Sequence, residues 1–401
     1  MIQNPPNYTV ISITTADVGP IQISNSNFGP LAGNVGSKVI PGASLRAVDP
    51  HIVNAYADFW SLAFERELGR GTVFSAEYSG SAGRKLYDIA NINRLGTGPF
   101  YLKSNSANPF TGAASTRLNG QYTNINFRGQ HGTSNYNGLS LSLESSRLGA
   151  GNRLTNIFKG IQFTTRYTYS KAKDNLSSTF SESTNNGSFI LGYLDPFNPK
   201  LDYGPADFDV RHRFVSSFNW NLPVGEKMHG VGKQVLGGWT ITGIVSARTG
   251  TPFSVYDCNN GITICMRMEQ VAGGLAFHGP SNPASPGDPN RFNFIDLRPQ
   301  LPGAGRFVDI SGGTEVGPYP ADMTKRNAFR SPGYWNVDFG LYKNFGLTER
   351  FKLQLRSEYF NVFNHANLFV SGSDADIAEV EQVQAFRSGR RHIQFAAKLI
   401  F

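Results

Sequence analysis

The densest group of chemically capable side chains lies in residues 202–213. It combines three carboxylates, two guanidinium groups and an imidazole, contributed by Asp202, Asp207, Asp209, Arg211, Arg213 and His212. Several carboxylate oxygens could ligate a cation such as Ca²⁺, which prefers oxygen ligands. In the alternative, structural interpretation, Asp207 and Asp209 pair with Arg211 and Arg213 and order a loop at the entrance of a strand. We expect the ion pairs, and no metal or other cofactor.

Two cysteines, Cys258 and Cys265, enclose a short turn-forming segment in DCNNGITIC. A turn at Asn-Asn-Gly would bring them face to face and allow a small disulfide in an oxidising compartment. Two unpaired loop thiols are the alternative. Metal binding is less favoured, since no histidine lies close by in sequence and two ligands rarely suffice.

The sequence carries no recognised catalytic motif. The seven histidines are dispersed, and no pair has the helical i, i+4 spacing of a zinc protease. A G-x-S-x-G element between a strand and a helix, a phosphate-binding loop and a dinucleotide fingerprint are all missing. The net charge of +8 is scattered along the chain, without a nucleic-acid-binding pattern. We therefore expect neither an enzyme nor a nucleic-acid-binding protein.

The elements that must position these residues are indicated by alternation of polar and apolar side chains. In residues 351–359, Phe351, Leu353 and Leu355 share one parity, whereas Lys352 and Arg356 occupy the other. A side-chain period of two is typical of a strand with two different faces. The same pattern predicts nine strands, near residues 60–64, 74–78, 139–144, 161–169, 213–222, 239–249, 335–345, 351–359 and 391–401.

The polar parity suits the water-filled interior of a membrane barrel better than the core of a soluble protein, because buried polar groups are costly. No stretch approaches the roughly 18 consecutive apolar residues of a spanning helix. We therefore predict an all-β, antiparallel transmembrane β-barrel. Its lumen-lining residues would include Arg166, Lys352, Arg356 and Lys398. Aromatic residues near strand ends would form girdles at the membrane interfaces: Tyr56, Phe59, Trp60, Tyr167, Tyr169, Trp220, Trp239, Tyr334 and Trp335.

The connections between predicted strands alternate in length. Short connections lie at residues 69–71, 148–159, 223–237 and 346–349, and long ones at 81–135, 172–210, 250–333 and 363–390. Short periplasmic turns and long extracellular loops are typical of outer-membrane barrels. The last strand would then descend to the periplasm and end on Phe401, which we expect to act as an aromatic signal for the barrel assembly machinery.

The number of predicted strands indicates an incomplete barrel. Bacterial single-chain barrels have even strand numbers, and an open sheet edge in lipid leaves unpaired backbone groups. A tenth strand near residues 8–14 would make the number even. Alternatively, partner strands are missing upstream. The first residues do not form a signal peptide. We therefore expect a fragment, with an uncertain N-terminal segment at 1–55 that could hold one strand and a loop, and a barrel portion at 56–401.

Several segments together resemble the barrel of Oar-like TonB-dependent transporters of the kind abundant in Acidobacteria. They are YNGLSLSLESSR (136–147), FTTRYTYSKAKDN (163–175), DYGPADFDVRHRFVSSFNWNLPVG (202–225), GGWTITGIVSARTGTPFSV (237–255), SEYFNVFNHANL (357–368) and GRRHIQFAAKLIF (389–401). The resemblance covers roughly residues 55–401. It implies the C-terminal portion of a barrel of about 22 strands, with a plug and an N-terminal segment that contacts TonB. Neither is present in this sequence.

The sequence thus predicts an outer-membrane, TonB-dependent receptor or transporter barrel in a Gram-negative bacterium. Its partners would be outer-membrane lipid, the TonB system through a missing N-terminal region, and an unidentified extracellular ligand captured above all by residues 250–333. One alternative is a structural or adhesive outer-membrane protein without transport activity. Another is a secreted, soluble, carbohydrate-binding or hydrolytic β-protein.

Overall fold

The structure is a computed structural model of the 401-residue chain. It describes residues 43–69, 71–93, 119, 122–146, 158–178, 193–225, 228–257, 266–267, 291–296, 324–348, 350–370 and 382–401. The strand expected near residues 8–14 lies outside these ranges, as do Cys258 and Cys265. Among the described residues, no helix is both long and apolar enough to cross a bilayer.

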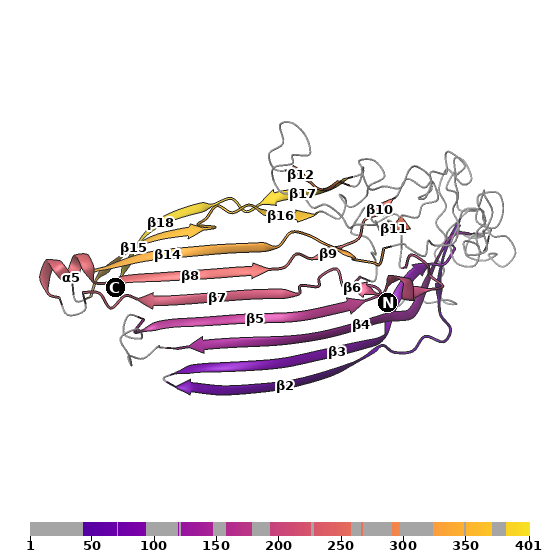
Figure 1. Cartoon of the computed structure of the whole chain (residues 1–401), viewed down its shortest axis with the longest axis horizontal. Coiled ribbons are helices and arrows are strands. Elements are labelled where there is room, and N and C mark those ends of the chain that lie inside the picture. Colours follow the sequence, from indigo (N-terminus) through magenta and orange to yellow (C-terminus); the bar gives the residue numbers. More distant parts are fainter. Residues whose placement is uncertain are drawn as a thin grey trace, which may run out of the picture.

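The molecule is built on one curved antiparallel sheet, in which strands that follow one another along the chain are neighbours (Figure 1). Nine long strands form it in the order β18-β15-β14-β8-β7-β5-β4-β3-β2. Their bounds are β2 Tyr56–Gly69, β3 Thr72–Asn91, β4 Tyr122–Ser145, β5 Ile161–Asp174, β7 His212–Asn221, β8 Trp239–Arg248, β14 Tyr334–Gly346, β15 Lys352–Phe360 and β18 His392–Ile400. All nine predicted strands are therefore confirmed.

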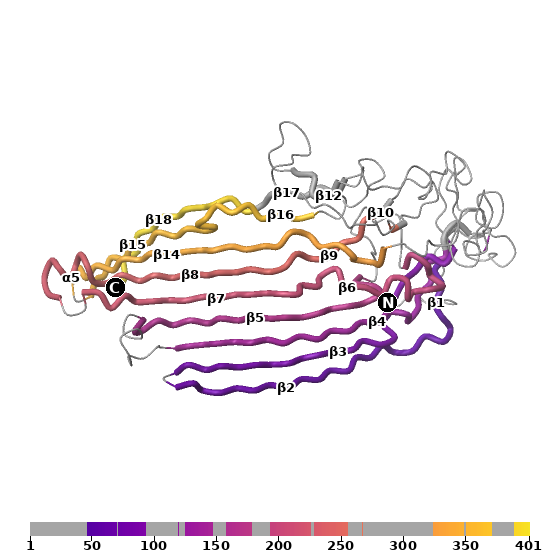
Figure 2. Tube along the Cα trace, in the orientation of Figure 1, coloured from indigo at the N-terminus to yellow at the C-terminus, as the bar shows by residue number. Residues whose placement is uncertain are grey.

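Shorter elements surround this sheet. At its loop end β1 (Ala43–Val48) lies near β4 (Figure 2) and pairs with it in parallel, and β6 (Gly204–Pro205) pairs with β5. Three small separate sheets join β10 (Tyr256–Asp257) to β11 (Met266–Arg267), β9 (Pro252–Phe253) to β13 (Phe329–Arg330), and β17 (Gln382–Ser388) to both β12 (Arg291–Asp296) and β16 (Asn367–Val370). The described helices are η2 (Pro199–Asp202) and α5 (Gly230–Leu236).

The register separates the two faces of the sheet as the alternation predicts. One cross-strand row is almost entirely apolar: Phe64, Ala76, Leu141, Tyr167, Phe214, Ala247 and Trp335. The adjacent row, on the opposite face, is mostly polar: Glu65, Ser75, Ser142, Arg166, Val215, Ser246 and Asn336. We call these the outward and the inward face. Two residues of the expected girdles, Phe59 and Tyr334, fall on the inward face.

No dry core lies behind the outward face within the described residues. Large apolar side chains stay open there, and Phe395 is 74% exposed. The buried apolar residues, such as Ile89, Ile125, Leu194 and Val255, lie instead at the loop end of the sheet. A soluble sandwich would bury its outward rows against a second sheet, whereas a barrel wall turns them toward lipid.

The two ends of the sheet differ. The short connections, α5 and the C-terminus lie at one end, and the long connections at the other (Figure 1). One expectation was wrong in detail: β3 and β4 extend far into the connection expected at 81–135. Beyond Tyr169 the outward face becomes polar, where Lys171 and Lys173 face Asn137 and Asn135. The spanning part of β5 therefore ends near Tyr169.

Candidate functional site

The inward face forms a polar wall with a hollow of about 650 Å³. Gln162, Asn219, Thr242 and Glu358 line it, and all four lie on inward rows. Neighbouring inward side chains are joined by short contacts. The Tyr342 hydroxyl donates to Glu358 at 2.9 Å, and Gln354 donates to Asn344 at 2.9 Å. Such a wall can offer hydrogen bonds to a polar solute passing along it.

The four residues predicted to line the lumen all share the inward parity. Arg166 donates to Glu144 of the adjacent strand at 2.7 Å, and both side chains remain largely solvent-exposed. Arg356 donates to Gln354 at 2.6 Å and stacks over the Tyr342 ring at 5.4 Å. Lys398 lies opposite Gln354, and Lys352 opposite Ile400, close to the short-turn end. The structure thus places them along the wall rather than in one pocket.

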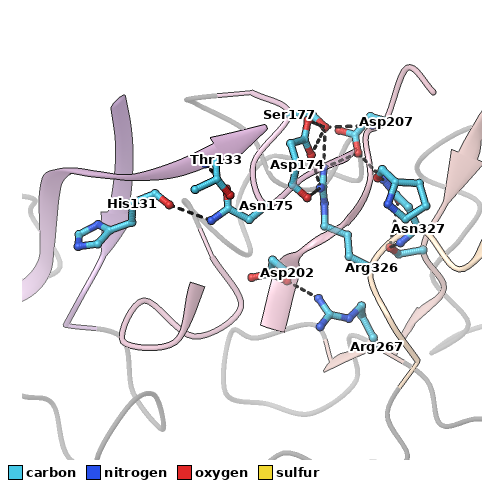
Figure 3. A network of polar contacts seen from close by, with 12 residues as sticks. His131, Thr133, Asp174, Asn175, Ser177, Asp202, Asp207, Arg267, Arg326 and Asn327 are labelled. Atoms are coloured by element: carbon cyan, nitrogen blue, oxygen red, sulfur yellow. Dashed lines mark hydrogen bonds and ion pairs between the residues drawn. The ribbon is translucent and has the colours of Figure 1, made fainter. Parts of the chain in front are cut away.

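A network of buried ion pairs closes the loop end of this wall. Its central residue is Arg326, which is 1% exposed. Arg326 donates to Asp174 at 2.6 Å, and to Asp207 and Ser177 at 2.7 Å each (Figure 3). Asn327 also donates to Asp207 at 2.7 Å. This arrangement ties the end of the long connection after β8 to the end of β5.

Two further arginines extend the network. Arg267 donates to Asp202 and to the carbonyl oxygens of Thr324 and Leu201. Arg330 donates to the Asp209 carboxylate and to the backbone of Gly250. We call the whole group the outer platform; it comprises Asp174, Ser177, Asp202, Asp207, Asp209, Arg211, Arg267, Arg326, Asn327 and Arg330.

Asp209 is the most completely engaged carboxylate of the outer platform. It accepts the Ala172 amide at 2.6 Å and the Arg211 guanidinium at 3.0 Å, besides Arg330. Burial alone would raise the pKa of Asp209. The Ala172 amide and the guanidinium groups of Arg330 and Arg211 outweigh burial and hold that pKa below its usual range. The carboxylate is therefore ionised at neutral pH.

Beside the outer platform, an asparagine joins β4 to the end of β5. The Asn175 side chain accepts the Thr133 amide at 2.8 Å and donates to the His131 carbonyl at 2.9 Å (Figure 3). His131 in turn contacts Asp88 of β3 through its ring nitrogen at 3.2 Å. The extensions of three strands are thus fixed to one another by side chains.

Asp207 and Asp209 form ion pairs as the sequence predicts, but only one of the two predicted arginine partners takes part. Asp209 does meet Arg211, but Asp207 meets Arg326, and Arg213 lies on β7 opposite Arg248. His212 turns to the outward face, where it contacts the Tyr167 hydroxyl at 2.7 Å.

Sequence reasoning missed Asp174, Arg267, Arg326 and Arg330. Arg326 is 119 residues from Asp207 along the chain, and no spacing pattern connects them. The described residues contain no group of three side chains placed to hold a metal ion. The disulfide between Cys258 and Cys265 stays a prediction, since both residues lie outside the described part of the chain.

Comparison with known proteins gives one family match. The model of the outer membrane beta barrel domain family matches residues 1–394. No curated protein matches the chain.

Among solved structures, the outer membrane transporter YddB from Escherichia coli is similar, with a TM-score of 0.44, 11% identity, and 90% of this chain and 34% of that chain covered. The ferric citrate transporter FecA in the unliganded form has a TM-score of 0.37 and 10% identity, over 86% of this chain and 31% of that one. The chain thus spans about a third of the length of these transporters.

Proposed function

The chain belongs to the outer membrane beta barrel domain family, and from this premise we propose that it forms part of the barrel of a TonB-dependent transporter. The protein lies in the outer membrane, with the outward face of its sheet toward lipid. Family membership leaves the secreted, soluble alternative without support.

The observation that carries the proposal is the continuous polar inward face. Its rows run from the outer platform to the short-turn end, and they contain charged residues at several levels: Glu65, Glu77, Glu144, Arg166, Arg213, Arg248, Glu358 and Lys398. Charges at several levels of a mostly polar face suit a water-filled lumen along which a polar solute can pass. In the proposed mechanism, the extracellular loops capture a polar ligand, which then passes along this wall when a plug moves.

The open edges support a larger barrel. Within the described part of the chain, no strand pairs with the outer edge of β2 or of β18, and both strands are exposed along their whole length. Unpaired backbone groups in lipid cost several kcal/mol each. We propose that further strands complete the wall and that the plug and the TonB contact belong to the same larger protein.

Transport can be tested with the full-length protein in a Gram-negative host. Cells with and without TonB would be offered a panel of radiolabelled ferric siderophores and fluorescent oligosaccharides. We expect at least one member to accumulate only in cells that contain TonB. Equal accumulation of every panel member in both hosts would contradict the proposal and favour the structural or adhesive alternative.

The loop assignment needs a separate variant. Removing residues 268–323 keeps Arg267, Arg326 and Arg330 in the chain, but it also removes β12, one of the two partners of β17. We expect this variant to assemble as a heat-modifiable barrel that no longer binds the transported panel member. A shorter deletion, of residues 371–381 in the connection between β16 and β17, serves as the control for loop shortening. Unchanged binding after the first deletion would refute capture by the long connection.

A further inference from the structure

The short-turn end carries an amphipathic helix whose apolar side is exposed in the described structure. In α5, Val231 and Val235 are one turn apart and are 79% and 58% exposed. Met228 and Leu236 extend the same side and are also exposed. We call these four residues the α5 stripe. The other side of the helix carries Lys233 and Gln234, so the two sides differ clearly in polarity.

The polar contacts of α5 fix its position against the outward face. Gln234 donates to the carbonyl of Gly346, the last residue of β14, at 3.2 Å. Trp239, on the outward parity at the start of β8, donates its indole N–H to the Val235 carbonyl at 3.1 Å. The helix is therefore held by the end of β14 and by the start of β8.

Lys343 explains why a helix is needed at this place. It lies opposite Trp239, so it has the outward parity that faces lipid elsewhere in β14. Its ammonium group donates to the carbonyl oxygens of Val235 and Gly237 and lies over the Trp239 ring at 5.0 Å. Lys343 is 5% exposed as a result. The last carbonyls of a helix favour a cation, and a lysine on a lipid-facing wall needs acceptors.

We propose that α5 is an interfacial helix that inserts the α5 stripe into the phospholipid headgroup boundary at the periplasmic side of the barrel. Trp239 and Phe345 share the outward parity, and both rings lie beside the Lys343 ammonium that contacts the end of the helix. Apolar residues on one side of a helix, with a lysine and a tryptophan beside them, suit this boundary, where one side is oily and the other wet. The helix thereby sets the depth at which this wall sits in the bilayer. This inference rests on membrane localisation and not on transport.

Site-directed labelling tests the proposal in the full-length protein. Cys258 and Cys265 are first replaced by serine, and single cysteines are then introduced as V231C, V235C and, on the polar side, the matched control K233C. Each carries a bimane label. The proteins are reconstituted in vesicles of phosphatidylethanolamine and phosphatidylglycerol, with a doxyl group near the start of a lipid chain as quencher. We expect several-fold stronger quenching by lipid at 231 and 235 than at 233, and the reverse order with aqueous iodide.

Two outcomes would overturn the proposal. Weak quenching by the lipid quencher and equally strong quenching by iodide at all three positions would mean that the helix projects into water. Protection of 231 and 235 from both quenchers would mean that a protein covers the stripe. A further variant, K343M, tests whether the contacts of Lys343 with the Val235 and Gly237 carbonyls hold the helix in place. Labels at 231 and 235 should then lose most of their preference for the lipid quencher, while the barrel keeps its heat-modifiable mobility. An unchanged quenching pattern in K343M would reject the role assigned to Lys343.

Discussion

Arg326 is the single side chain that joins most parts of the outer platform. It satisfies two carboxylates and a serine hydroxyl, although it is almost completely buried. A buried arginine stabilises little by itself, but its removal leaves buried charges without a partner. The platform therefore depends on Arg326 for order more than for net stability.

Replacing Arg326 by methionine should loosen the platform without unfolding the wall. We expect R326M to lose about 3–5 kcal/mol of local stability, because the buried carboxylate of Asp174 loses the guanidinium that pairs with it. Hydrogen exchange in peptides covering residues 172–177 and 204–208 would measure the loss. The exposed Arg350, in the turn before β15, offers the matched control R350M. Equal protection in both variants would show that the ion pairs contribute nothing to order.

Asp209 gives the platform a pH dependence whose sign follows from its lowered pKa. Its ionised form is stabilised in the folded state, so this contribution is complete above the unfolded value of about 4 and is lost as pH falls through the lower, folded pKa. Exchange in residues 328–333, corrected for its intrinsic pH dependence, should accelerate only below about pH 4. The D209N variant should exchange faster already at neutral pH. The same acid-induced acceleration in D209N would assign the effect to another group.

At the scale of the strand, the effect of a substitution on stability depends on whether the side chain lies on the outward or the inward face. Phe395 and Gln394 are neighbours on β18, where Phe395 lies on the outward face and Gln394 on the inward face. They pair with Ser357 and Glu358 of β15. We expect F395R to destabilise the full-length protein by about 2–4 kcal/mol, because its charge enters lipid, whereas Q394R should cost little. Urea titration of the protein folded into vesicles would compare the two. If Q394R destabilised the protein more than F395R, our assignment of the inward and outward faces would be wrong.

Elements with a strict period of two could be predicted from the sequence, and others could not. The strands around Leu353 and Leu141 were found because lipid and water act on alternate side chains of each. Helix α5 was missed since seven residues that include two glycines have low intrinsic helix propensity. It depends on Lys343, more than 100 residues away. The parallel pairing of β1 with β4 and the arginines of the platform are likewise non-local.

At the scale of the whole molecule, the open sheet is the main constraint. Residues 1–401 expressed alone should fail to give a compact, heat-modifiable monomer, because β2 and β18 would each leave an unpaired edge in lipid. The larger protein that we propose should give one. Gel mobility before and after heating, with resistance to protease, would distinguish them. A heat-modifiable monomer from residues 1–401 alone would show that this sheet closes without additional strands.

The length of β3 and β4 has a consequence for how a solute first meets the protein. These strands have 20 and 24 residues, whereas roughly 10 tilted residues cross the hydrocarbon. At about 3.3 Å per residue and a tilt of about 45°, the surplus carries the loop ends of β3 and β4 on the order of 20–30 Å beyond the hydrocarbon. A solute that diffuses toward this side of the wall would therefore meet the raised ends of β3 and β4 before it reached the headgroups.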